Sequence, residues 1–140
     1  MLDGGLGADT LIGGTGNDTL FADINATKGF VTTAETKGIE NVLFRVQAGQ
    51  NTSGDNNMYN YGIIDAERMK DVTNWENNNS RADLVIEDVR INDNQITKDI
   101  TIVMRETDPG NVDYGVYFDQ NSLRNVSSSS SQINLRVLDT

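Results

Sequence analysis

The chain of 140 residues contains no cysteine and no histidine. Without cysteine it can form neither a disulfide nor a thiolate metal site. Without histidine it lacks the commonest general base and the usual ligand of transition metals. It also lacks the short motifs of nucleophile elbows, phosphate-binding loops and zinc-protease helices. Hydrolysis would therefore have to rest on carboxylates alone, and no pair of acids is placed by its neighbours in one cleft. We expect a protein that is not an enzyme.

Long apolar runs and basic residues are scarce as well. No segment has the length of apolar sequence that crosses a bilayer, and the N-terminus has no signal-peptide core. The 11 basic residues stand against 21 acidic ones, which gives a formal net charge of −10. This charge argues against nucleic acid and against anionic membrane surfaces as partners. It suits a protein that takes up calcium, and it also suits plain solubility.

What the chain does contain is a nine-residue pattern that occurs twice in tandem near the N-terminus. The first copy, 4–12, reads GGLGADTLI and the second, 13–21, reads GGTGNDTLF. The shared glycines allow sharp turns that residues with a Cβ avoid. The shared aspartate offers carboxylate oxygen to a hard cation, and the turn carbonyls offer more. The Thr-Leu-x tail of each copy predicts a short strand, with Leu11 and Leu20 facing a narrow core.

This repeat resembles the calcium-binding nonapeptide of the RTX, or haemolysin-type, family. The resemblance covers about residues 3 to 21. It implies a parallel β-roll in which Ca²⁺ lies between a repeat and the next but one, so two repeats supply only half-sites. The pattern breaks at Ala22, although Asp23 and Asn25 could still offer oxygens opposite the first turn. The implied ligand residues are Asp9, Asp18, Gly5, Gly7, Gly14, Gly16, Asp23 and Asn25.

Beyond the repeats the apolar residues alternate, as they do in half-buried strands. Strands are predicted over 38–46, 82–91, 100–104, 114–118 and 133–137, with a bulge near Glu87 and Asp88. Asp65 is a candidate N-cap of a short helix over 65–72. Pro109 and Gly110 occupy the central positions of a predicted type II turn over 108–111, which would join two antiparallel strands as a hairpin.

These features predict an all-β chain in two parts. Residues 1–27 form the end of a calcium-binding β-roll, and residues 28–140 form an antiparallel β-sandwich of the jelly-roll or Ig-like kind. The alternative is that the roll continues as an irregular parallel β-helix. Leu2 and Asp3 resemble the tail of an earlier repeat, so we expect these coils to belong to a longer array.

The expected function is structural. The resemblance implies a secreted or cell-surface protein that leaves the cell by type I secretion, with calcium ordering the roll and supporting the folding of the adjoining β domain. Two alternatives stay open. An adhesin or carbohydrate-binding module would contact a glycan or a surface protein, with Tyr59, Tyr61 and Trp75 as candidate contacts. A self-assembling surface or matrix protein would instead associate with further copies of itself.

Overall fold

The computed structural model describes residues 10–25, 31–47, 61–90, 92–93, 96–97, 99–107, 112–120 and 133–138. These residues form strands joined by turns, so the predicted all-β class is confirmed. No helix in this part of the chain is long and apolar enough to cross a membrane. The strands are β1 (Thr10–Ile12), β2 (Thr19–Asn25), β3 (Val31–Thr33), β4 (Glu35–Lys37), β5 (Asn41–Gln47), β6 (Tyr61–Asp65), β7 (Asn74–Asn78), β8 (Asp83–Val89), β9 (Asn92–Asp93), β10 (Ile96–Thr97), β11 (Ile100–Arg105), β12 (Tyr114–Phe118) and β13 (Ile133–Leu138).

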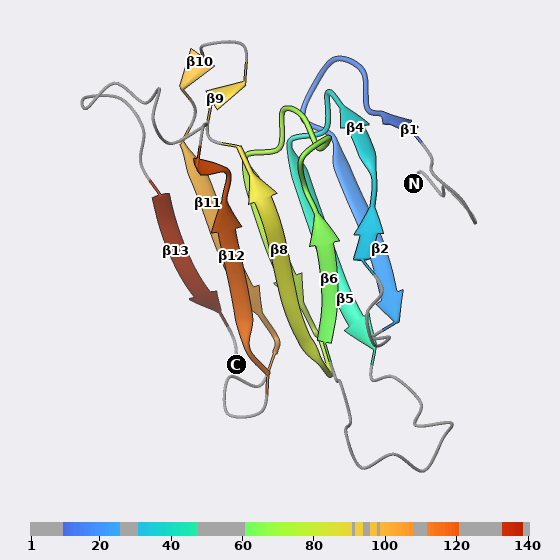
Figure 1. Ribbon diagram of the computed structural model, residues 1–140, viewed down its shortest axis with the longest axis vertical. Helices are drawn as coiled ribbons and strands as arrows, with labels where there is room; N and C mark the ends of the chain where they lie inside the picture. Colours follow the sequence, from blue (N-terminus) through green and yellow to red (C-terminus); the bar gives the residue numbers. More distant parts are fainter. Residues whose placement is uncertain are drawn as a thin grey trace.

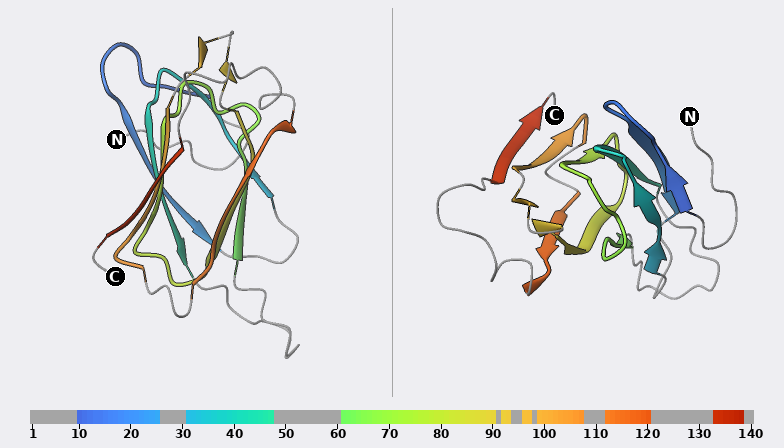
Figure 2. Two further views of the ribbon diagram at one scale, coloured as in Figure 1. Left: turned by 90° about the vertical axis from the view of Figure 1, so that its left-hand side faces the viewer. Right: turned by 90° about the horizontal axis from the view of Figure 1, so that it is seen from above.

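The strands are wound as a coil. Successive long strands alternate between a five-stranded sheet, in the order β13-β11-β7-β5-β2, and a four-stranded sheet, in the order β12-β8-β6-β3 (Figure 1). Every pairing within these two sheets is parallel. A third, two-stranded sheet joins β1 and β4, also in parallel, and a bridge between Thr36 and Met69 continues it. Each turn of the coil therefore lies directly on the previous one, with the two large sheets facing each other (Figure 2).

The expected antiparallel sandwich is wrong. Among the described strands only the short pair β9 and β10 is antiparallel. The expected hairpin is wrong for the same reason, because β11 pairs with β7 and β13 in one sheet whereas β12 pairs with β8 in the other. Its turn, residues 108–111, lies outside the described residues. Parallel pairing is what the alternative, an irregular parallel β-helix, predicts.

Two local predictions have opposite outcomes. The predicted helix from Asp65 is absent, because the chain makes a tight turn at 67–68 and Met69 then forms a parallel bridge with Thr36. The Asp65 carboxylate does accept the backbone N–H of Glu67 (2.9 Å), but it caps this turn and no helix follows. The predicted bulge is confirmed. Residues 87 and 88 of β8 lie opposite the single residue Tyr117, since the register shifts between the pairs at Val116 and Phe118.

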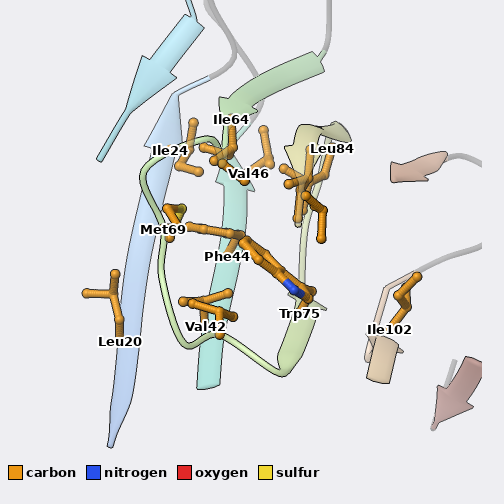
Figure 3. Packing of buried hydrophobic residues seen from close by; sticks show 14 of the residues in the cluster. Leu20, Ile24, Val42, Phe44, Val46, Ile64, Met69, Trp75, Leu84 and Ile102 are labelled. Carbon is orange, nitrogen blue, oxygen red and sulfur yellow. The ribbon is translucent and has the colours of Figure 1, made fainter. Parts of the chain in front are cut away.

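Apolar side chains stacked on successive strands form the core. One row runs in register from Leu20 through Val42 and Trp75 to Ile102, and all four side chains are buried (Figure 3). Leu11 is partly buried against the same cluster. The prediction that the leucines of both repeats face inward is therefore confirmed.

The last strand of the repeat segment belongs to this same architecture. β2 pairs with β5 over all seven of its residues, from Thr19 opposite Asn41 to Asn25 opposite Gln47. The predicted boundary at residue 27 falls within 26–30, outside the described residues, and stays a prediction.

Candidate functional site

The turn of the second repeat, residues 13–18, connects β1 to β2. Two of its glycines have left-handed backbone angles, with φ of +102° at Gly14 and +126° at Gly16. A Cβ at either position would meet no atom within 4 Å. Backbone conformation alone thus demands glycine at these two positions. This agrees with the role that the sequence predicts for them.

Gly13 is needed for a different reason, which is close packing. A Cβ at Gly13 would lie 2.1 Å from the carbonyl oxygen of Gly38 on the next coil and 2.9 Å from Oδ2 of Asp18. The Asp18 side chain therefore folds back over the start of its own turn. The absence of a side chain at Gly13 brings the carboxylate, the turn backbone and the next coil together.

Asp18 is the central residue of this site. Its carbonyl oxygen accepts hydrogen bonds from the backbone N–H of Asn41 (3.1 Å) and Glu40 (3.3 Å). Its own backbone N–H donates to the Glu40 carboxylate (2.8 Å). Its Oδ2, however, is buried and has no hydrogen-bond partner among the described residues. A buried carboxylate oxygen without a partner is costly, since it has lost water and gained nothing in exchange.

The same corner of the next two coils also carries acids. Glu40 lies one coil on from Asp18, and its carbonyl accepts the backbone N–H of Thr73 (2.9 Å) and of Asn74 (3.0 Å). Asp71 lies on the following coil, where its Oδ2 accepts the backbone N–H of Gly38 (3.1 Å). The described residues nevertheless include no group of three or more acids close enough to hold a metal ion. The described part of the corner thus offers one unpartnered carboxylate oxygen and a glycine turn, which is an incomplete cation site.

The first-repeat ligands cannot be placed, because Asp9, Gly5 and Gly7 lie outside the described residues. Asn25 ends β2 opposite Gln47, and its side chain is outside the described part as well.

Asp23, the remaining predicted ligand, forms an ion pair. Its two carboxylate oxygens accept hydrogen bonds from Nε (2.5 Å) and Nη2 (2.6 Å) of Arg45 on the neighbouring strand. These bonds hold the pKa of Asp23 below its ordinary value. A metal at Asp23 would have to compete with this guanidinium.

Of the three candidate aromatic contacts, two lie in the described part of the chain. Tyr59 lies outside the described residues, and Tyr61 begins β6 with a half-buried side chain. Trp75 is 1% exposed in the centre of the core, which corrects its assignment as a surface contact. The reason is its row in the sheet, where it lies between Val42 and Ile102.

Two residues that contact the candidate residues were not predicted from the sequence: Glu40, which contacts Asp18, and Tyr114, which contacts Trp75. Glu40 belongs to no motif, and it lies beside Asp18 because β2 pairs in register with β5. Tyr114 donates a hydrogen bond from its hydroxyl to the carbonyl oxygen of Trp75 (3.1 Å), and burial raises the pKa of that hydroxyl. No signal in the chain pairs these residues, because both pairs join positions more than 20 residues apart.

Comparisons with known proteins give no match: no family model, no curated protein and no solved structure corresponds to this chain.

Proposed function

We propose that this chain is a non-catalytic calcium-binding structural segment of a secreted or cell-surface protein of RTX type. The observation that supports the proposal is the buried, unpartnered Oδ2 of Asp18 beside a left-handed glycine turn. Calcium takes carboxylate oxygens as ligands, and Asp18 offers one here. An ion held at this oxygen would offset the cost of its burial.

The proposed consequence is a fold that calcium stabilises. Without the ion, the buried Oδ2 of Asp18 opposes closure of the first coil onto the second. With the ion, binding free energy adds to folding free energy. Millimolar calcium outside the cell would then favour the folded coil, and low calcium inside the cell would favour an open, exportable chain. Secretion and extracellular location rest on the repeat resemblance.

The test is thermal unfolding across a calcium titration, with chelator as the reference. At a calcium concentration ten times the dissociation constant, we expect about 1.4 kcal/mol of added stability and a rise in Tm of about 5 °C. Asp18→Asn removes the charged ligand and should abolish most of that rise. In chelator this variant should be at least as stable as the parent, because the amide loses less on burial than the carboxylate.

Asp88→Asn is the matched control, since Asp88 is an exposed acid away from the turn and asparagine tolerates its positive φ of 57°. It should keep the full calcium response. A parent protein with identical melting curves in calcium and in chelator would rule out calcium stabilisation of this chain.

A further inference from the structure

The strands of the two large sheets differ in charge. The strands of the four-stranded sheet, of which Figure 1 shows β6, β8 and β12 side by side, contain four acids and no lysine or arginine. These acids are Asp65, Asp83, Glu87 and Asp88. The strands of the five-stranded sheet contain two acids and three arginines. The four-stranded sheet therefore has the charge that attracts a cationic partner.

The outer face of this sheet also carries an apolar stripe. Val31, Ile63 and Val85 lie in register from β3 through β6 to β8. They point outward, because the next residues along β6 and β8 are buried in the core. Gly115 continues the row on β12, and a Cβ there would lie 3.3 Å from Cε2 of Tyr117. The ring of Tyr117, a residue that is 63% exposed, therefore lies over this glycine and extends the stripe.

The bulge of β8 places two acids beside Tyr117. Glu87 and Asp88 both lie opposite it, and all three residues are exposed. The residues on either side of the two acids, Ile86 and Val89, are buried, so both carboxylates point outward with the ring. An aromatic face attracts a guanidinium, and a carboxylate forms charge-assisted hydrogen bonds with it. The extra residue of the bulge thus strengthens one site for a cation.

The five-stranded sheet contains the same combination with its cation in place. Cζ of Arg45 lies 5.3 Å from the centre of the Phe21 ring. Nε and Nη2 of the same guanidinium donate to the Asp23 carboxylate (2.5 and 2.6 Å). One arginine is thus held by a ring and an acid of the neighbouring strand. At Tyr117 the ring and the acids are present, whereas Arg90, which follows β8, is engaged in other ion pairs.

We infer that this outer face binds an arginine-rich segment of a partner protein. A guanidinium stacks on the Tyr117 ring and donates to Glu87 or Asp88, while the methylene stems of the arginines lie on the apolar stripe. Arginine suits the site better than lysine, because its planar group stacks on a ring and pairs with a carboxylate at once. The chain has no two adjacent basic residues, so a second copy of these 140 residues does not supply such a segment. We call the surface the acidic face, and it comprises Tyr117, Glu87, Asp88, Val31, Ile63 and Val85.

The test is a titration of the protein with capped tetra-arginine, observed by NMR of the tyrosine rings and the backbone amides. We expect binding at low salt that moves the signals of Tyr117, Glu87 and Asp88. Capped tetra-lysine should bind about threefold more weakly, because an ammonium cannot stack as a plane on the ring. Capped tetra-citrulline has the shape of the arginine peptide without its charge, and it should not bind.

Three variants locate the site. Tyr117→Leu keeps an apolar side chain but removes the ring, so it should weaken tetra-arginine binding about two- to fivefold and abolish the preference over lysine. Glu87→Gln should weaken the binding about two- to fivefold, since one carboxylate is lost. Glu106→Gln removes the same charge from an exposed acid that follows β11 in the other sheet, and it should keep the affinity within about 1.5-fold.

Three results would overturn the inference. Equal weakening by Glu87→Gln and Glu106→Gln would mean that only the net charge of −10 attracts the peptide. Tetra-lysine that binds as tightly as tetra-arginine would exclude stacking on Tyr117. No binding up to about 5 mM peptide would mean that the acidic face does not hold a guanidinium. Circular dichroism establishes that each variant is folded. The acidic face does not include Asp18, so we expect the same affinities in calcium and in chelator, and the result is independent of the proposed calcium role.

Discussion

Residues that look alike in the repeat have different physical tasks. Gly14 and Gly16 are held in left-handed conformations with empty space around them, whereas Gly13 lies against Gly38 and Asp18. The backbone angle determines the first two, and close approach between coils determines the third. A pattern of three glycines therefore encodes both the shape of one turn and its contact with the next.

Gly16→Ala isolates the conformational task. An alanine there would meet no neighbouring atom, so its cost is backbone strain alone, and we expect a loss of about 1–3 kcal/mol in unfolding free energy. Gly115→Ala is the control, because Gly115 has no positive φ and its Cβ would touch the exposed Tyr117 ring at 3.3 Å and Cγ2 of Val85 at 3.9 Å, an ordinary contact distance. Urea unfolding measures both. A Gly16→Ala protein as stable as the parent would contradict the conformational role.

Asn77 is a polar residue in an apolar row. It is fully buried between Phe44 and Met104 on the neighbouring strands, and in the described part of the chain neither its amide nitrogen nor its amide oxygen has a hydrogen-bond partner. Asn77→Leu keeps the size of the side chain and removes two desolvated polar atoms. We expect a gain of about 1–3 kcal/mol in unfolding free energy, measured in urea.

Asn74→Leu provides the comparison, since Asn74 is on the same strand but half-buried. It should bring no such gain. A loss of stability in Asn77→Leu would mean that the amide has partners, such as a bound water, that the apolar side chain cannot replace.

At the scale of the strands, β2 and β5 are joined by the ion pair between Asp23 and Arg45. Hydrogen bonds from Arg45 lower the pKa of Asp23 below its unfolded value of about 3.9. A lowered folded pKa means that the stabilisation is complete above the unfolded pKa and is lost as the pH falls through the folded pKa. The pair therefore stabilises the first coil at neutral pH and not in strong acid.

Arg45→Gln should move the pKa of Asp23 upward toward its ordinary value, observed by NMR titration of the carboxyl carbon. Arg90→Gln is the control, because Arg90 pairs instead with Asp119 (3.2 Å) and Glu67. High salt should reduce the difference between parent and Arg45→Gln, since both partners are partly exposed. An Asp23 pKa that is the same in all three proteins would disprove the pairing.

Strands with clear apolar alternation, such as β5, β8 and β11, were predictable, but β6 and β7 were missed and the partners of the strands were not predictable. Val42, Phe44 and Val46 alternate with Leu43 and Arg45, which identifies a strand with one buried face. An antiparallel sandwich and a parallel coil whose sheets each expose one face to solvent both produce this alternation. The Pro-Gly turn favoured a hairpin, yet β11 and β12 belong to different sheets, because the chain crosses from one sheet to the other between them. Pairing depends on where the chain goes after each turn, which alternation does not encode.

The candidate site likewise has a part that the sequence predicts and a part that only the strand register determines. Asp18 and its glycines follow from a local motif, so the sequence identified them. The contact with Glu40 and the pairing of Asp23 with Arg45 join positions 22 residues apart, and they arise only from the register of β2 with β5. The burial of Trp75 likewise follows from its row and not from its neighbours along the chain.

At the scale of the whole molecule, the core is a set of continuous rows and not a set of separate clusters. The row through Leu20, Val42, Trp75 and Ile102 crosses four strands, and a single coil cannot bury its own share of it. Coils of this kind gain stability from their neighbours. The first coil, which carries the candidate calcium turn, is therefore coupled to the central coil that holds the only tryptophan.

This coupling predicts that calcium added at one end is felt at Trp75. In urea, the fluorescence of Trp75 and the circular dichroism of the strands should show coincident transitions, and calcium should move both midpoints together. Asp18→Asn should cancel the movement in both signals, because it removes the ligand and leaves the rows intact. The contrary result is two separate transitions, with calcium moving only the one that the fluorescence of Trp75 does not report. It would mean that the ion stabilises the first coil alone. In that case the contacts between neighbouring coils would contribute less free energy to folding than the interactions within each coil.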